Sequence, residues 1–372
     1  MIVVKHEFGA NRRLSYYEDE QKMDILLFVE NVLMEYATEN QKCRSEGKKA
    51  MTKIIRENIW TLEQGVTPSL LRTFACCKEH FRLQYVEGYS STGVNEALEF
   101  GSIVHYLLEY VYKENDPQPT RGMLDNLLEE YNTNRLEELN LDKGFVNPQE
   151  HEKLEKLYAV ALEVVQQYFC HYDETEDELE FLATEQEFDF YDDDLQIRMR
   201  GKIDGVLQGA NNTLTIFDTK TKSRIDINNL CLKLPKDLQM MFYARAVEKI
   251  YEQKVRKVIY NLIQRPQQRQ KKTENLKAYC NRICGEIQEE PTNYFKRIEM
   301  DLELSDFKRF EKEQLKPILW DLKEWVMGGN HYFNPDALEM YGKPSRFFNA
   351  ILADNFEGLV KRKKVFPELE RS

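Results

Sequence analysis

The chain has 372 residues, 42% of them hydrophobic, and a formal net charge of −12 at pH 7. It is long enough for one large domain or two smaller ones, each with a hydrophobic core. The acidic charge argues against passive, sequence-independent adhesion to nucleic acid. Seven scattered cysteines, an odd number, fit reduced thiols in a cytoplasm better than a disulfide scaffold.

Residues 1–60 predict a separate, mainly helical N-terminal extension. Residues 24–35 have helical apolar spacing, and residues 48–60 follow with a polar, basic helical pattern. The first residues contain no apolar core long enough for a signal peptide, and no apolar stretch approaches the roughly 18 residues of a membrane span. We therefore expect a cytoplasmic protein whose extension serves as a docking or covering element.

Helices are expected in the next part of the chain. Thr67 is a suitable N-cap, and Pro68 suits the first helical position, where its missing N–H costs nothing. Further helices are expected at residues 97–113, 121–139 and 148–170. Gly101 and His105 are four residues apart on the first of these and therefore share one of its faces.

The hydrophobic period then changes to that of strands. Three strands are expected at residues 181–191, 196–208 and 213–219, followed by a helix at 236–252, a fourth strand at 255–264 and helices at 273–288 and 304–327. The dividers Asp192–Asp194 and Gly209–Asn212 have turn-forming composition. Together these elements predict an α/β core with a substantial helical elaboration.

Two carboxylates and an amine stand out on the predicted strands. Asp204 precedes Gly205 at the end of an apolar run, where an isolated Asp-Gly is usually an ordinary turn. Asp218 lies within a second apolar run, and a buried carboxylate is costly unless a metal or cation is nearby. Asp218 and Lys220 emerge on the same face of a strand. Such a set can hold a divalent cation beside a proton-handling group, which is the minimal equipment for phosphodiester cleavage.

Three further polar residues have two interpretations each. Gln239 and Tyr243 share a helix face, but an amphipathic helix with a Tyr at the core boundary would show the same pattern. A lone His on an apolar face, such as His105, is more often a hydrogen-bonded core residue than a ligand. Neutral imidazole is nevertheless a good ligand for a transition metal such as Mn²⁺.

Five motifs occur in a fixed order along the chain. They are Thr67-Pro-Ser with Cys76, Gly101 with His105, Gly201 with Asp204, Asp218-x-Lys220, and Gln239 with Tyr243. This order resembles the RecB-type nucleases of the PD-(D/E)xK superfamily, which include the nuclease domains of AddB and the CRISPR-associated RecB-like exonucleases. The resemblance covers roughly residues 65–350. It implies a restriction-endonuclease-like core, which is a mixed central sheet flanked by helices.

The resemblance also suggests how the chain is divided. Residues 1–60 would form the helical extension, and residues 61–350 the nuclease domain, with its catalytic core at about 97–264. Residues 351–372 would form a C-terminal tail, which contains the basic cluster 361–364.

A metal site is implied by the same resemblance. His105, Asp204 and Asp218 would coordinate Mg²⁺ or Mn²⁺, together with the main-chain carbonyl of Thr219. Oxygen-rich ligation suits Mg²⁺ better than zinc.

Further roles follow from the resemblance. Lys220 would orient the attacking water or help to deprotonate it. Gln239 and Tyr243 would position the DNA backbone or steady Lys220. Glu185 or Glu187, on the preceding strand, could support the ligands without touching the metal.

One departure from the family concerns cysteine. Many relatives carry an iron–sulfur cluster held by one early and three C-terminal cysteines, and such a cluster needs four thiolates. Cys76 or Cys77 fills the early position, but residues 334–348, which resemble the C-terminal region, contain no cysteine. We therefore expect no iron–sulfur cluster. Packing of the aromatic tail is expected to hold the C-terminal region against the early helix instead.

Charge is unevenly distributed along the chain. Residues 171–194 hold twelve acidic residues and no Lys or Arg, whereas residues 254–277 hold eight Lys or Arg and one Glu. A charge run is usually a solvated face, but beside a nuclease core it can serve as a phosphate track. The candidate DNA-binding residues are Arg265, Arg269, Lys271 and Lys272.

The expected function is a Mg²⁺- or Mn²⁺-dependent DNA exonuclease acting on ends or single strands in recombination, replication or repair. The chain lacks a Gly-x-x-x-x-Gly-Lys-Ser/Thr motif and so carries no motor of its own. It could act alone or with a helicase on another chain, in a bacterial or phage-infected cell. A structure-specific endonuclease or nickase, and a degenerate DNA-binding subunit, are the alternatives.

Overall fold

The computed structural model describes residues 58–92, 94–114, 119–143, 148–173, 179–328, 333–340, 343–362 and 364–369. The expected extension at 1–60 lies almost entirely outside these residues. The chain forms two units, and the larger one, Asn58–Lys323 with His331–Ser372, contains the sheets and the site described below. Of the helices in the described ranges, none combines the length and apolar character needed to cross a bilayer.

A five-stranded mixed sheet forms the centre of this unit. Its strands are β2 (Phe181–Asp192), β3 (Ile197–Gln208), β4 (Leu214–Lys222), β5 (Val255–Gln264) and β6 (Phe295–Asp301). They lie in the order β2-β3-β4-β5-β6, and only the β4–β5 pair is parallel. The parallel pair requires a crossover, which the chain between β4 and β5 supplies through two helices, Ile227–Lys233 and Leu238–Tyr251. The mixed α/β architecture confirms the fold class predicted from the sequence.

The sequence located the first four strands closely, whereas β6 is absent from the expected elements. β6 starts directly after the short helix α10 (Pro291–Tyr294) and pairs with β5 at the edge of the sheet. Its side chains are mostly partly buried rather than strictly alternating. The periodic signal of this strand is therefore weak.

Helices make up most of the remaining chain. Those before the sheet are α2 (Pro68–Cys76), α3 (Lys78–Phe81), the π-helical turn η2 (Arg82–Val86), α4 (Glu96–Glu114), α5 (Arg121–Lys143) and α6 (Pro148–Asp173). Those that follow β4, besides the short α10, are α7 (Ile227–Lys233), α8 (Leu238–Tyr251), α9 (Leu276–Glu289), α11 (Leu304–Phe310), α12 (Lys316–Val326) and α13 (Phe348–Ala353). Among the described residues, two short strand pairs lie outside the central sheet: β1 (Tyr89–Ser91) with β9 (Leu359–Lys361), and β7 (Glu339–Met340) with β8 (Lys343–Pro344). An isolated bridge joins Val66 to Met199 of β3.

One of the expected helices differs in detail from the structure, and another begins as predicted. The helix predicted at 304–327 is divided into α11 and α12 by the π-helical turn η5, Glu311–Leu315. Thr67 caps α2 as predicted, because its hydroxyl accepts a hydrogen bond from Leu70 N at 3.2 Å and Pro68 occupies the first turn.

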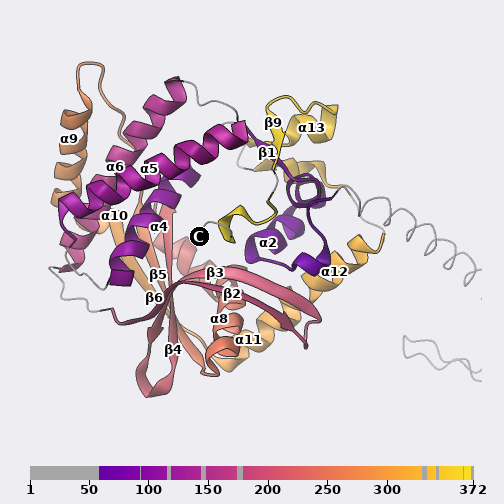
Figure 1. Cartoon of the computed structure of the whole chain (residues 1–372). Coiled ribbons are helices and arrows are strands. Elements are labelled where there is room, and N and C mark those ends of the chain that lie inside the picture. The colour runs from indigo at the N-terminus through magenta and orange to yellow at the C-terminus, as the bar shows by residue number, and fades with distance from the viewer. Residues whose placement is uncertain are drawn as a thin grey trace, which may run out of the picture. The chain divides into compact units, whose positions relative to one another are not determined.

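The helices cover the sheet in two layers (Figure 1). One large apolar cluster joins α4, α5, α6 and α9 to β5 and β6, and includes Phe100, Val164, Ile263 and Phe295. α8 packs on β3, β4 and β5, where Phe242 lies beside Phe188 of β2. The sheet is thus enclosed between the helical elaboration and α8, so that side chains of β4 meet different helices on its two faces.

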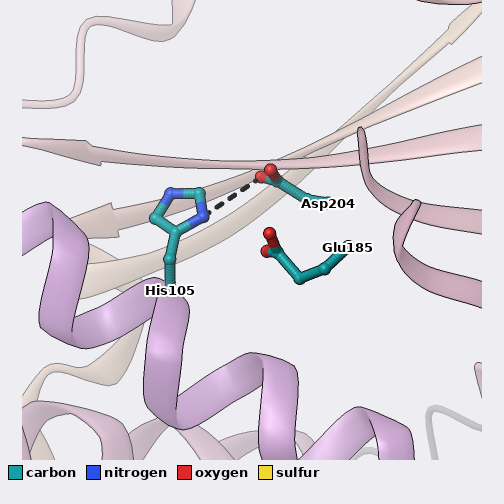
Figure 2. A group of neighbouring side chains, drawn as sticks. All are labelled: His105, Glu185 and Asp204. Carbon is teal, nitrogen blue, oxygen red and sulfur yellow. Dashed lines mark ion pairs between the residues drawn. The ribbon is translucent and has the colours of Figure 1, made fainter. Parts of the chain in front are cut away.

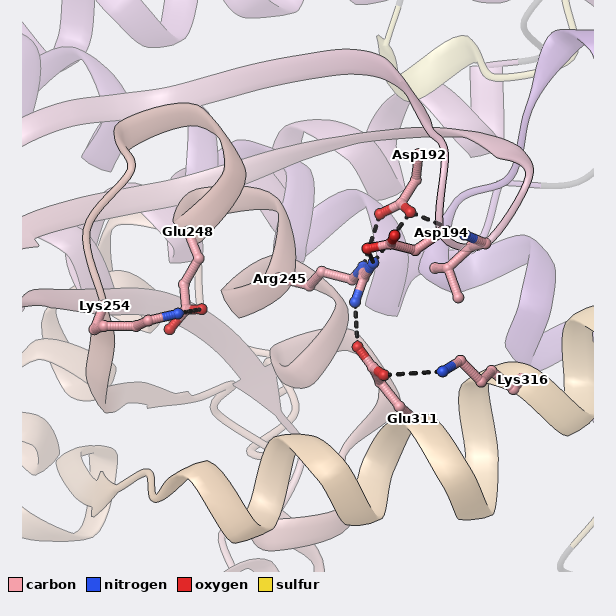
Figure 3. A network of polar contacts seen from close by, with 8 residues as sticks. Asp192, Asp194, Arg245, Glu248, Lys254, Glu311 and Lys316 are labelled. Carbon is pink, nitrogen blue, oxygen red and sulfur yellow. Dashed lines mark hydrogen bonds and ion pairs between the residues drawn. The ribbon is translucent and has the colours of Figure 1, made fainter.

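An ion-pair network anchors α8 to its surroundings (Figure 3). Arg245 Nε lies 2.8 Å from Asp192 Oδ2, at the end of β2, and its Nη1 pairs with Glu311 on η5. Asp192 is almost fully buried. Its carboxylate is therefore stabilised by a bidentate guanidinium, which fixes α8 and the residues that α8 presents to the sheet.

The C-terminal segment packs on α3 and η2, which directly follow the early helix that the sequence named as its partner. His80 of α3 lies edge-on to Phe347, with ring centroids 4.7 Å apart, and its Nδ1 is 3.0 Å from Ser345 Oγ. Tyr85 contacts Phe366 farther along. Cys77 caps α3 through its sulfur, which accepts from His80 N at 3.5 Å. The expectation that no iron–sulfur cluster is bound stays a prediction.

Candidate active site

The site lies where two central strands separate. The β3–β4 pairing runs from Gln208 and Leu214 to Gly205 and Phe217. Beyond that point Thr219 N donates a hydrogen bond to Asp204 Oδ2 at 2.7 Å. The Asp204 carboxylate thus lies in the fork between β3 and β4, and an amide of the adjacent strand fixes its orientation.

Asp218 and Lys220 form the second element of the site. Asp218 is fully buried, and Lys220 Nζ lies 2.9 Å from its Oδ1 and 2.7 Å from its Oδ2. Lys220 keeps 25% of its side chain exposed. The predicted Asp-x-Lys pair therefore shares one face of β4, with the carboxylate inside and the ammonium at the opening.

Helix α8 contributes two polar residues beside this pair. Gln239 Nε2 lies 3.5 Å from Asp218 Oδ1 and donates to Tyr243 Oη at 3.1 Å. Asp237 caps the helix by accepting from Gln239 N and Met240 N. The two residues predicted to share a helix face thus do so, and they face Asp218.

Helix α4 brings His105 to the same opening. Gly101, one turn earlier, lies so close to β4 that an added Cβ would be 3.1 Å from Thr221 Oγ1. The close approach places His105 Nδ1 at 3.4 Å from Asp204 Oδ2. The Gly101 and His105 spacing noted in the sequence therefore has a packing cause as well as a chemical one.

Glu185 completes a group that could hold a metal ion (Figure 2). Ligand atoms of His105, Glu185 and Asp204 all lie within 4.8 Å of one another. One nitrogen and two carboxylates fit the donor preferences of Mn²⁺ and Mg²⁺ better than those of a thiolate-bound metal. Glu185 also pairs with Lys202, whose Nζ is 2.6 Å away. The structure thus places Glu185 among the candidate ligands, although the sequence suggested only a supporting role.

The other predicted ligands lie next to this group. Asp218 is not a member of the group, and both of its oxygens contact Lys220. Thr219 offers its N–H to Asp204, and the role predicted for its carbonyl stays a prediction. Glu187, two residues after Glu185, is exposed.

The titration of the buried pair reflects its surroundings. Burial raises the pKa of Asp218 above its usual range, and the Lys220 ammonium offsets this only in part. Burial disfavours the Lys220 ammonium, but the carboxylates of Asp218 and Asp204 outweigh this effect and raise its pKa. Lys220 is therefore held protonated, which suits a group that orients water or stabilises negative charge better than a general base.

The predicted DNA-binding residues are spread over the loop that follows β5. Arg265 forms an ion pair with Glu96, with 2.6 Å between its Nη2 and Glu96 Oε2, and its guanidinium lies over the ring of Phe100. Arg269, Lys271 and Lys272 are exposed. Three of the four basic side chains are thus accessible to a ligand, whereas Arg265 also ties the loop to α4.

The sequence profile of the PD-(D/E)XK nuclease superfamily matches residues 65–332, which span all five strands of the central sheet and every site residue above. The chain belongs to this superfamily. Phosphodiester hydrolysis is the activity for which the superfamily is named, and divalent metals are its usual cofactors.

Solved structures show more distant similarity. A protein from Eubacterium rectale, described only provisionally as an exonuclease, is 11% identical with a TM-score of 0.41, over 79% of this chain and 94% of its own. A second, SSO0001, is 12% identical with a TM-score of 0.23, over 72% of this chain and 88% of its own. Among curated proteins, none matches this chain.

Proposed function

We propose that this PD-(D/E)xK protein is a RecB-type, Mg²⁺- or Mn²⁺-dependent deoxyribonuclease that acts as an exonuclease. The observation that carries the proposal is the convergence of His105, Asp204, Asp218 and Lys220 at the β3–β4 fork. The order of the five sequence motifs supports the RecB-type assignment.

The residues of the fork divide the chemistry between them. A divalent cation at such a site lowers the pKa of a bound water and neutralises charge on the phosphoryl group. His105, Glu185 and Asp204 would hold the cation, with Asp218 at its side. Lys220 would orient the attacking water, because its ammonium is partly exposed and fixed by both oxygens of Asp218.

Gln239 and Tyr243 would act on this arrangement from α8. Gln239 is within reach of Asp218 and hydrogen-bonds Tyr243. The pair would hold the Asp218 carboxylate in place or contact the DNA backbone. Arg269, Lys271 and Lys272 would follow the phosphates beyond the site, as exposed cations do without reading sequence.

Two other functions remain compatible with the same residues. A structure-specific endonuclease or nickase would use the identical site on a different DNA form. A degenerate nuclease fold kept as a DNA-binding subunit would need no catalytic pair, and the intact Asp218–Lys220 contact argues against it. A role in recombination, replication or repair, a helicase partner and a phage or mobile-element origin are parts of the proposal that rest on the resemblance. A cytoplasmic location is a further part, and it rests on the scattered cysteines and the composition of the first residues.

A nuclease assay tests the proposal directly. Wild type is incubated with Mg²⁺ or Mn²⁺ and end-labelled single- or double-stranded DNA, beside Asp218→Ala and Lys220→Ala. Each variant is expected to lose activity by about 10²-fold or more. Lys257→Ala is the matched control and should retain activity, because this partly exposed lysine of β5 pairs with Glu299 of β6.

The substrate form separates the remaining functions. An exonuclease degrades linear DNA and leaves closed circular DNA intact, whereas an endonuclease or nickase cuts the circle. Wild type that is as inactive as Asp218→Ala on every substrate would point to a binding subunit and end the enzyme proposal.

A further inference from the structure

A row of buried polar residues crosses the sheet behind the catalytic strand. Thr219 of β4 is the register partner of Asn261 on β5, and Asn261 is the partner of Arg297 on β6. Register partners place their side chains on the same face of a sheet, and alternation places Asp218 and Lys220 on the other. Thr219 is nearly buried and Asn261 fully so. The row therefore lies directly beneath the Asp218-x-Lys220 pair.

Hydrogen bonds connect the row through a tyrosine of α6. Arg297 Nη2 donates to Tyr168 Oη at 3.0 Å, and Tyr168 donates to Asn261 Oδ1 at 3.1 Å. Asn261 Nδ2 then donates to Thr219 Oγ1 at 3.2 Å. All three donations run towards β4 and start from a guanidinium, an arrangement in which each bond polarises the next.

The same chain of contacts reaches helix α4. Tyr112 of α4 lies 2.6 Å from Tyr168, oxygen to oxygen. Tyr112 is seven residues, about two helical turns, beyond His105, so both residues lie on the same side of α4. α4 and β4 are thus joined below the site through Tyr168 and Asn261, and joined at the site through His105 and Asp204.

The burial of so many polar groups in a row is costly within an apolar core. Tyr168 belongs to the large apolar cluster under the helices, next to Phe169 and Phe295. Burying hydroxyl, amide and guanidinium groups there requires that each be hydrogen-bonded, and an apolar set of similar shape would avoid that requirement. Such a row holds the groups it joins in a single geometry.

We propose that Asn261 and the Thr219 hydroxyl are positioning residues of the nuclease site. They hold β4 in register with α4, so that the Thr219 main-chain N–H keeps the Asp204 carboxylate beside His105 and ready for a divalent cation. The inference rests on the proposed nuclease function and adds residues that touch neither DNA nor metal.

Four variants test it against one control. Thr219→Val removes the hydroxyl with little change of shape, and Thr219→Ser keeps it. Asn261→Leu removes the central amide, and Tyr168→Phe removes the bridge to α4. The control is Tyr294→Phe, which deletes a buried hydroxyl bonded to Glu286 at 2.6 Å in the same apolar cluster but away from β4.

Each protein is first assayed for Mn²⁺ binding in the absence of DNA, with the free ion measured by electron paramagnetic resonance. The kcat and the KM for labelled DNA are then measured separately. Residues that orient metal ligands typically contribute about 10- to 100-fold to metal affinity or activity. Thr219→Val, Asn261→Leu and Tyr168→Phe should weaken Mn²⁺ binding and lower kcat by about that factor, with KM for DNA nearly unchanged. Thr219→Ser should bind Mn²⁺ like wild type, and so should Tyr294→Phe.

The outcomes separate this inference from the function on which it rests. Wild type that binds no Mn²⁺ and cuts no DNA overturns both. Wild type that binds and cuts, while Thr219→Val and Tyr168→Phe match Tyr294→Phe, overturns the positioning role alone. If Asn261→Leu does not fold, the comparison of Thr219→Val with Thr219→Ser still decides, because both keep the shape of the strand.

Discussion

Glu185 lies opposite Asp204 across the β2–β3 ladder, between the pairs Thr184–Gly205 and Gln186–Ile203. Its backbone has a φ of 46°, in the left-handed region. A Glu in that conformation costs about 1–3 kcal/mol and persists only where its surroundings over-determine it, and such residues cluster at functional sites. The strained residue is also the one that joins His105 and Asp204 in the candidate metal group.

Glu185→Gln tests whether this residue binds the metal. The amide removes a charge from the group, so the Mg²⁺ concentration for half-maximal cleavage should rise by about tenfold or more. Glu187→Gln, two residues along the same strand and exposed, is the control. Equal behaviour of the two variants would return Glu185 to the supporting role suggested by the sequence.

The metal requirement should depend on pH through Asp218. Burial raises the pKa of its carboxyl, so protons compete with the cation as the pH falls. The half-maximal Mn²⁺ concentration should therefore increase on acidification, because protonation removes a negative charge beside the candidate metal group. Direct Mn²⁺ binding at several pH values measures this.

In Asp218→Asn the pH dependence of Mn²⁺ binding should disappear. In the matched control Asp193→Asn, a residue of the exposed β2–β3 turn, it should persist. A slope that survives in Asp218→Asn would assign the effect to another carboxylate.

His80 should make folding stability sensitive to acid. Burial, followed by repulsion from Arg346, lowers its pKa from 6.5 to about 4. In the unfolded chain the imidazole takes up a proton near pH 6.5, whereas in the folded protein it resists until about pH 4. The unfolded state thus binds more protons in this window, so the free energy of unfolding falls as pH falls through it, by about 1–3 kcal/mol.

Denaturant unfolding at several pH values measures this loss. His80→Gln should lower stability at neutral pH, because Ser345 and Gln84 lose their partner, but should flatten the slope between pH 6.5 and 4. His151→Gln, on an exposed face of α6, should leave the slope as in wild type. A wild-type slope in His80→Gln would contradict the assignment.

The loop after β5 should set the salt dependence of DNA binding. Removing Arg269, Lys271 and Lys272 together by alanine should reduce the slope of log K against log salt by about 2 to 3, since each lost phosphate contact accounts for about 0.7 to 0.9. Alanine at Lys308, Lys312 and Lys361 removes the same charge elsewhere and is the control. Arg265→Ala should reduce stability as well, because it also releases Glu96.

The residues that could be predicted from the sequence are those with a local signal. Thr67 and Pro68 mark a helix start, and the spacings Asp218-x-Lys220 and Gln239-x-x-x-Tyr243 each place two side chains on one face of one element. The structure confirms these shared faces. The domain boundaries at 60 and 350 stay predictions.

What the sequence missed depends on pairing between elements. Glu185 and Glu187 are two residues apart on β2, so strand alternation alone places both on one face and does not tell them apart. The structure does, because Glu185 has a left-handed φ and lies beside His105 and Asp204, whereas Glu187 is exposed. Thr219, Asn261 and Arg297 become neighbours only through the register of three strands, and the first and last of them are 78 positions apart in the sequence. A local sequence pattern does not predict such pairing. Asn261 within an apolar strand is the one signal that could have drawn attention, because a central strand rarely buries an amide without a partner.

The contact between His80 and Ser345 has a consequence for biosynthesis. The two residues are 265 positions apart, and the ribosome adds roughly 5–20 residues per second, so the partner of α3 follows on the order of tens of seconds later. In the finished protein Leu83 is fully buried against Phe347 and Ala350. During that interval these two residues have not yet been made, so they do not cover Leu83. The early helices therefore keep an apolar side chain exposed during translation, until the last segment of the fold is made.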